Sequence, residues 1–111
     1  MKNWTRKNAI SSLKELIQKN KKVKRFGRNS QEHIRWLANG LRITEEIFGQ
    51  NSRYYATLSA YTWDERGSML LDGFDMEGQM ERRHNAAYLI QMEQAEGLLL
   101  AALDHLKDSK I

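Results

Sequence analysis

Residues 85–107, NAAYLIQMEQAEGLLLAALDHLK, carry the strongest periodic apolar pattern in the sequence. Their apolar residues recur three and four positions apart, which is the spacing of one face of an α-helix. The residues on this face are Met92, Ala95, Leu99, Ala102 and Leu106, and Tyr88, Leu89, Leu98 and Leu103 widen it. A face this wide has to be covered by other helices. The segment therefore predicts an all-α fold, a compact bundle of four or five helices with a long C-terminal helix as its spine.

Length and composition indicate one small helical domain. The chain has 111 residues, no cysteine and no proline. The length is typical of a single domain, here residues 1–111, and the lack of proline favours long helices. Without cysteine there is no disulfide and no thiol nucleophile, so we expect a reducing, cytoplasmic location. No apolar run approaches the ~20 residues of a membrane span, so we expect no membrane contact.

Charge is distributed unevenly along the chain. Residues 1–42 carry twelve Lys or Arg and two acidic residues, whereas residues 43–111 carry six basic and twelve acidic residues. The net charge of +4 is thus the sum of a +10 part and a −6 part. Such a division has two interpretations. Either the basic and acidic surfaces meet, within one chain or between copies, or the basic part binds a polyanion.

Capping residues define the first two predicted helices. Apolar spacing predicts a first helix over residues 7–19. Ser30 is a good N-cap, and Gly49 stands where a helix commonly ends in a left-handed conformation. We therefore expect a second helix over residues 31–48, and because two of its sides are apolar, it should be central.

A third helix and a long connection follow. Asn51 or Ser52 caps a helix over about residues 53–63. Residues 64–84 contain three glycines and predict an irregular connection. The final helix begins between residues 75 and 85 and ends near Lys107. Gly97 in its interior costs about 1 kcal/mol relative to alanine, and close approach of another helix is one reason to keep it.

A dense basic run follows the first predicted helix. Six of the ten residues from 19 to 28 are basic, namely Lys19, Lys21, Lys22, Lys24, Arg25 and Arg28. Because like charges repel and Gly27 interrupts the periodicity, we interpret residues 19–30 as a basic loop. The run is either a contact patch for the phosphates of DNA or RNA or a solvated linker. Phe26 is its only aromatic residue, so base stacking is not indicated.

The stretch Arg28-Asn-Ser-Gln-Glu-His33 resembles the signature of HEPN-type helical ribonucleases. The resemblance implies that Arg28 steadies a phosphate while His33 transfers a proton. In that family the motif lies late in the domain, whereas here it lies in the first third. The same residues also suit an N-cap and the first helical turn, so a ribonuclease is one alternative among several.

Aromatic residues gather in the second and third predicted helices. Helical geometry requires more than one of them to face outward, and exposed Tyr and Trp are common anchors of protein interfaces. We therefore predict an interface that includes Trp36, Tyr54, Tyr55 and Trp63. Core packing with the hydroxyls at its edge explains the same residues equally well.

Signatures of catalysis and cofactor binding are missing from the sequence. His33, His84 and His105 are far apart and lack the spacing of metal ligands. There is no P-loop, no dinucleotide fingerprint and no serine-nucleophile motif. We therefore expect no metal, no cofactor and no catalytic residue.

Three motifs together resemble a known kind of module. They are Trp36-Leu, Ile47-Phe48-Gly49-x-x-Ser52-x-Tyr54-Tyr55, and Ala95-Glu-Gly-Leu-Leu-Leu-Ala-Ala-Leu. Over about residues 34–107 they are similar to the N-terminal helical module of some bacterial antiphage or abortive-infection effectors. The resemblance implies an assembly or sensing module, and it carries over no site residue. We therefore expect a non-catalytic module that self-associates or docks a partner protein, with a small nucleic-acid-binding protein as the alternative beside the ribonuclease.

Overall fold

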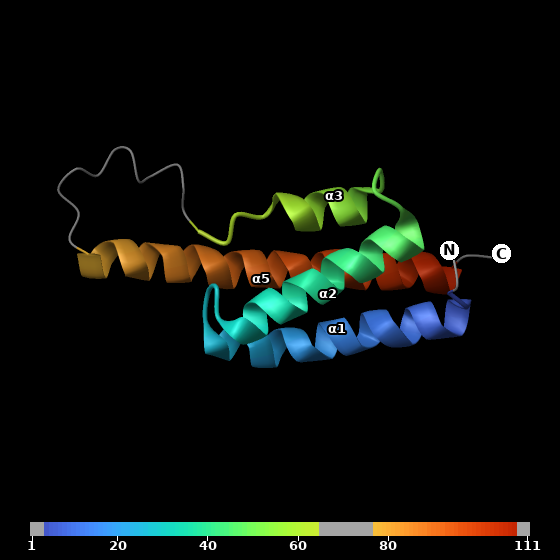
Figure 1. The fold of residues 1–111 in the computed structure, drawn as a ribbon, viewed down its shortest axis with the longest axis horizontal. Helices are drawn as coiled ribbons and strands as arrows, with labels where there is room; N and C mark the ends of the chain where they lie inside the picture. Colours follow the sequence, from blue (N-terminus) through green and yellow to red (C-terminus); the bar gives the residue numbers. More distant parts are fainter. Residues whose placement is uncertain (1–3, 65–76, 109–111) are drawn as a thin grey trace.

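The computed structural model describes residues 4–64 and 77–108, with the side chains of residues 4–64 and 81–108. These ranges form four helices and no strand: α1 (Arg6–Phe26), α2 (Gln31–Phe48), α3 (Arg53–Ala60) and α5 (Glu77–Asp108) (Figure 1). The predicted all-α bundle with a long C-terminal helix is confirmed.

Helix α5 is the longest element, with 32 residues, or about 48 Å at the rise of an α-helix. Helix α1 lies antiparallel beside it. The guanidinium of Arg6, at the start of α1, donates to the carbonyl oxygens of Leu106 and Lys107 near the end of α5. At the other end of α1, the Tyr88 hydroxyl donates to the Val23 carbonyl at 3.1 Å. The first turns of α5 extend beyond α1 (Figure 1).

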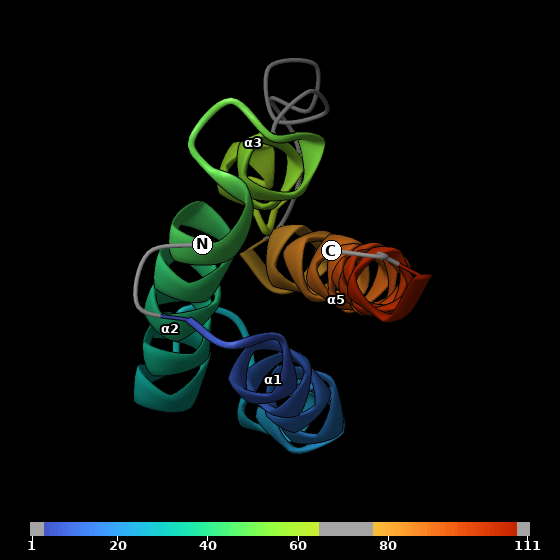
Figure 2. The same cartoon turned by 90° about the vertical axis from the view of Figure 1, so that its right-hand side faces the viewer.

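Each of the four helices packs against two neighbours, in the cyclic order α1, α5, α3, α2 (Figure 2). The apolar face predicted for residues 85–107 is the one that points into this ring. Its members Met92, Ala95, Leu99, Ala102 and Leu106 are all buried, together with Tyr88 and Leu103. Leu89, predicted on the same face, is instead exposed at the edge of that face, beside the basic residues at the end of α1.

The basic loop predicted over residues 19–30 is wrong for most of its length, because α1 continues to Phe26. Leu16, Asn20 and Val23 extend the buried stripe of α1 by two more turns, and the Asn20 amide donates to the Met92 carbonyl at 3.0 Å. Repulsion between neighbouring exposed cations costs only about 0.2–0.5 kcal/mol per pair, so burial of this stripe outweighs it. The loop is confined to the few residues before Ser30.

The remaining helix ends combine confirmed and revised predictions. Ser30 and Ser52 cap α2 and α3 as predicted, each accepting a backbone N–H at 3.2 Å, and α2 has the predicted bounds. Helix α3 ends at Ala60, three residues early, because the backbone turns there and buries the Trp63 indole in the core. Helix α5 begins at Glu77, within the predicted interval of residues 75–85, so the irregular connection predicted over 64–84 is wrong for residues 77–84. Residues 79–84, QMERRH, contain no helix breaker. Residues 65–76 lie outside the described part.

Candidate protein interface on the outer face of α5

The predicted nucleic-acid residues fall mainly on one helix. Lys19, Lys21, Lys22, Lys24 and Arg25 all belong to the last two turns of α1, and all but the half-buried Lys24 are exposed. Arg28 lies in the following loop, where its side chain is largely buried and its Nη2 is 3.6 Å from a carboxylate oxygen of Glu81. The structure thus brings five of the six cations together and directs the sixth toward α5.

Those cations continue a longer stripe, which we call the basic face of α1. Its exposed residues share the side of the helix opposite the core and are Lys7, Lys14, Lys21, Lys22 and Arg25. The stripe is about 27 Å long, from the helical rise per residue. Glu15 is the only acidic residue in α1, and it pairs with Lys19 at 2.7 Å.

The aromatic residues predicted to form an interface are mostly in the core. Trp36, Tyr54 and Trp63 are buried, and only Tyr55 is half-exposed. The indole N–H of Trp36 donates to the Leu16 carbonyl at 3.0 Å, and its ring meets that of Trp63 edge to face at 6.4 Å. The expectation that these residues face outward is therefore wrong for three of the four. Burial is favourable because the polar tip of Trp36 finds an acceptor inside the bundle.

His33 lies in the same cluster. Its ring is 1% exposed and is packed edge-on against Trp63, at 4.8 Å, and Tyr88, at 5.0 Å. Nδ1 accepts the backbone N–H of Asn29 at 3.2 Å. Burial lowers the pKa of His33 and raises that of Tyr88 to about 12, so both side chains are neutral near pH 7. A ring enclosed in this way has no access to a phosphodiester, so the geometry does not support the role that the ribonuclease resemblance implies for His33.

A second apolar surface lies on α5, on the side that points away from the core. Leu89, Ile90 and Leu100 are 46%, 56% and 43% exposed. In the described part of the chain only two other large apolar side chains, Phe26 and Ile34, are as exposed, and they belong to other helices. Large apolar side chains gathered on one surface usually mark an interaction site. We call this side, with Ala86, Glu93, Gln94, Gly97, Ala101 and Asp104, the outer face of α5.

The outer face has its own helical period. Its central line is Ala86, Ile90, Glu93, Gly97, Leu100 and Asp104, spaced alternately four and three residues apart. Such an alternation is the seam of a helix that packs against one other helix when its residues are apolar, and on this line Ala86, Ile90 and Leu100 are apolar. The signal was present in the sequence, where it ran opposite the stronger stripe that forms the core.

Gly97 occupies the middle of this line. A Cβ atom built at Gly97 would meet no atom within 4 Å. At Gly40 of α2, by contrast, a Cβ would lie 3.3 Å from Cδ2 of Leu58. The packing of this chain therefore explains the glycine at position 40, whereas no described residue approaches position 97.

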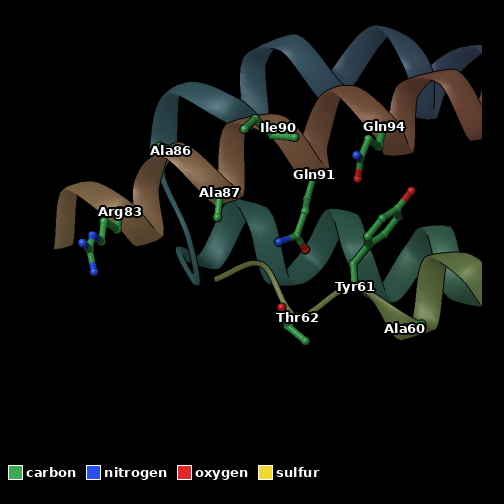
Figure 3. A pocket seen from close by; sticks show the side chains of 9 residues that line it. All are labelled: Ala60, Tyr61, Thr62, Arg83, Ala86, Ala87, Ile90, Gln91 and Gln94. Atoms are coloured by element: carbon green, nitrogen blue, oxygen red, sulfur yellow. The ribbon is translucent and has the colours of Figure 1, made fainter. Parts of the chain in front are cut away.

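A groove borders the outer face on one side, and basic residues of α1 border it on the other. On one side, a groove of about 560 Å³ runs between α5 and the segment after α3 (Figure 3). Ala86, Ala87 and Ile90 line it from α5, and Tyr61 and Thr62 line it from the opposite side. On the other side, Lys21, Lys24 and Arg25 of α1 lie beside Leu89 and Glu93 of α5.

Gln91 holds the segment that forms the far wall of the groove. Its Oε1 accepts the backbone N–H of Trp63 at 2.7 Å, and its Nε2 donates to the Asp64 carbonyl at 3.2 Å. The groove therefore has a wall fixed by Gln91, and Arg83 and Gln94 line it from α5 beside Ala86, Ala87 and Ile90.

Among the described residues, no group of three His, Asp or Glu side chains is placed to hold a metal ion. None of the helices in that part of the chain has an apolar stretch long enough to cross a bilayer. Comparison of the chain with known protein families, with curated proteins and with solved structures gives no match.

Proposed function

We propose that this chain is a helical self-association module and that its contact surface is the outer face of α5. The observation that carries the proposal is the exposure of Leu89, Ile90 and Leu100 on a single side of one helix. Covering apolar surface is favourable by about 25 cal/mol per Å². Self-association between two such faces removes this surface from water on both copies at once, which is what a symmetric contact requires.

The size of the face bounds the strength of the contact. From Ala86 to Asp104 it is about 27 Å long and about one helix diameter, ~10 Å, wide. Standard protein interfaces bury about 800 Å² per partner, so a contact through one helix face is at the small end. We therefore expect a reversible dimer with a dissociation constant in the micromolar range.

Sedimentation equilibrium from about 1 µM to about 500 µM tests the proposal, since this interval brackets micromolar dissociation. We expect the wild-type chain to pass from monomer to dimer and Ile90→Lys to remain a monomer. The matched control is Ile34→Lys, because Ile34 on α2 is 55% exposed, almost the same as Ile90. The control should dimerise like the wild type. A wild-type monomer throughout, or equal loss in both variants, would overturn the proposal.

A second candidate function is binding to the phosphates of a nucleic acid through the basic face of α1. It is favoured by five exposed cations on one side of a helix that carries a single acidic residue, itself paired with Lys19. Binding through phosphate contacts of this kind weakens as the salt concentration rises, so its salt dependence can be measured. This function is compatible with self-association because the two surfaces belong to different helices and adjoin at one edge, where Lys21 and Arg25 lie beside Leu89 and Glu93.

A cytoplasmic setting in bacterial phage defence completes the proposal. It is supported by the resemblance of residues 34–107 to helical modules of antiphage effectors and by the lack of cysteine. In that setting the module would assemble an effector or a partner protein by joining two copies of itself.

A further inference from the structure

We infer that the second copy packs antiparallel along α5, about a two-fold axis near Ala95. This inference rests on the proposed self-association and adds the direction and register of the contact. It follows from three features: the places of Ile90, Gly97 and Leu100 along the outer face, the order of the charges on that face, and the position of α1 beside it.

The register follows from the seam of the outer face. In an antiparallel helix pair, the two kinds of seam position face each other. Pairing about Ala95 sets Ile90 against Leu100 of the second copy, and Leu100 against its Ile90. Between these two apolar layers, Glu93 lies over Gly97 of the second copy.

This register explains both the glycine at position 97 and the glutamate at position 93. The space in front of Gly97 is open, so the aliphatic part of a glutamate side chain can lie across it. The carboxylate of Glu93 extends past the seam toward solvent, on the side where Lys21, Lys24 and Arg25 lie. An acidic residue between two apolar layers is tolerated when its charge stays hydrated and near cations.

Charge order favours the antiparallel direction. A parallel pair would set Glu93 beside Glu93 of the second copy, and Asp104 beside its Asp104. Like charges in register are unfavourable and suppress that arrangement. The antiparallel pair instead sets Asp104 opposite Ala86, one turn from Arg82 and Arg83 at the start of α5.

Helix α1 extends this complementarity. Because α1 runs antiparallel to α5, its basic end lies beside the first half of α5, as the contact between Tyr88 and Val23 shows. The second copy's acidic Asp104 and Asp108 come to this same end of the interface. The uneven charge of the sequence, +10 before residue 43 and −6 after it, thus becomes a contact between copies.

Cysteine cross-linking tests the direction, because the chain has no cysteine of its own. The variants are Ala86→Cys and Asp104→Cys, both at exposed positions, with Ile34→Cys as the control. In the antiparallel pair, position 86 faces position 104, whereas two copies of position 86 are about 27 Å apart along the helix. A disulfide needs Cα atoms within about 7 Å, so each variant alone should stay monomeric on non-reducing gels.

An equimolar mixture of Ala86→Cys and Asp104→Cys should give a heterodimer, which its intact mass distinguishes from either homodimer. Circular dichroism of each variant confirms that the helices are kept. Homodimers formed by each variant alone would show a parallel pair and overturn the inference. They would leave self-association through α5 intact.

Two further outcomes separate this inference from the function on which it rests. If the wild-type chain sediments as a monomer at about 500 µM, where a micromolar contact is saturated, the proposed function itself is wrong. If the wild type dimerises but only Ile34→Cys cross-links, the outer face of α5 is not the contact, and the inference fails with it.

Discussion

His33 makes the stability of the core depend on pH. Burial lowers its pKa from the ordinary value of 6.5, so below about pH 6.5 the unfolded chain binds a proton that the folded chain does not. The stability that depends on a neutral His33 is therefore fully present above pH 6.5. It is lost as the pH falls from there through the folded-state pKa, by at most about 1.4 kcal/mol per pH unit.

Urea unfolding between about pH 7.5 and about pH 5 measures this effect on the free energy of unfolding. The comparison is with His33→Gln, which keeps a polar side chain and removes the titration. We expect the wild type to lose more stability than the variant over this interval. Equal pH dependence of the two proteins would show that His33 is not the group responsible.

At the level of single residues, helix caps can be predicted from local chemistry, whereas the burial of a tryptophan cannot. Ser30, Ser52 and Gly49 are recognisable from their types alone, because capping depends on only a few neighbouring backbone groups. Trp36 and Trp63 cannot be assigned in this way. Whether an indole faces water or core depends on which acceptor lies nearby, and the acceptor of Trp36 is the carbonyl of Leu16, twenty residues earlier.

Replacing the interior glycine of α2 or of α5 with alanine should change the free energy of unfolding in opposite directions. Gly97→Ala should raise the free energy of unfolding by about 0.5–1 kcal/mol, because alanine favours the helix and its methyl group meets open space. Gly40→Ala should lower it, since the methyl group would lie 3.3 Å from the fully buried Leu58. Overpacking of a core costs about 1–3 kcal/mol, which exceeds the gain in helix propensity.

These stabilities are measured by urea unfolding at low protein concentration, where the chain is monomeric. A gain in both variants would mean that Leu58 moves aside without cost. A decrease in both would mean that position 97 is already covered in the monomer, which would also weaken the assignment of the outer face of α5.

Some features of whole helices can be predicted from the sequence, and others depend on packing that the sequence does not reveal. The core stripe of α5 is evident because its spacing is regular from Tyr88 to Leu106, over about five turns. The predicted end of α1 is misplaced because the density of cations outweighs the signal of Asn20 and Val23, whose burial depends on α5. The outer face of α5 escapes prediction because Glu93, Gly97 and Asp104 interrupt its apolar residues, so its pattern is weaker than that of the core stripe.

At the scale of the whole molecule, dimerisation through the outer face of α5 decides how the basic faces of the two α1 helices are arranged. A two-fold axis between antiparallel α5 helices is perpendicular to the plane that contains them, so both α1 helices lie on the same side of the dimer. Figure 2 shows α1 and α3 on opposite sides of α5. Of the basic face of α1, Lys21 and Arg25 lie beside Leu89 and Glu93 at the edge of the contact, whereas Lys7 and Lys14 belong to the other half of the helix. Dimerisation would therefore join two basic faces into one surface for a polyanion.

The joined basic surface should bind a polyanion in a salt-dependent way. If it binds the phosphates of double-stranded DNA, the logarithm of the binding constant should fall linearly with the logarithm of the salt concentration, with a slope of about 0.9 for each phosphate neutralised. Fluorescence anisotropy with a labelled duplex measures the slope. Replacing Lys21 and Lys22 with glutamine should reduce the slope by about one for each lysine that neutralises a phosphate in the wild type.

In the same assay, comparing Ile90→Lys with Ile34→Lys separates the effect of dimerisation on DNA binding from the effect of one added positive charge. Both variants add one positive charge at a position of nearly equal exposure, but only Ile90→Lys should prevent dimerisation. If the two basic faces act together, Ile34→Lys binds more tightly and with a steeper salt slope, because a joined surface reaches more phosphates than a single α1 does. Equal slopes would mean that each α1 binds alone, and absence of binding at low salt would remove the second candidate function while leaving self-association untouched.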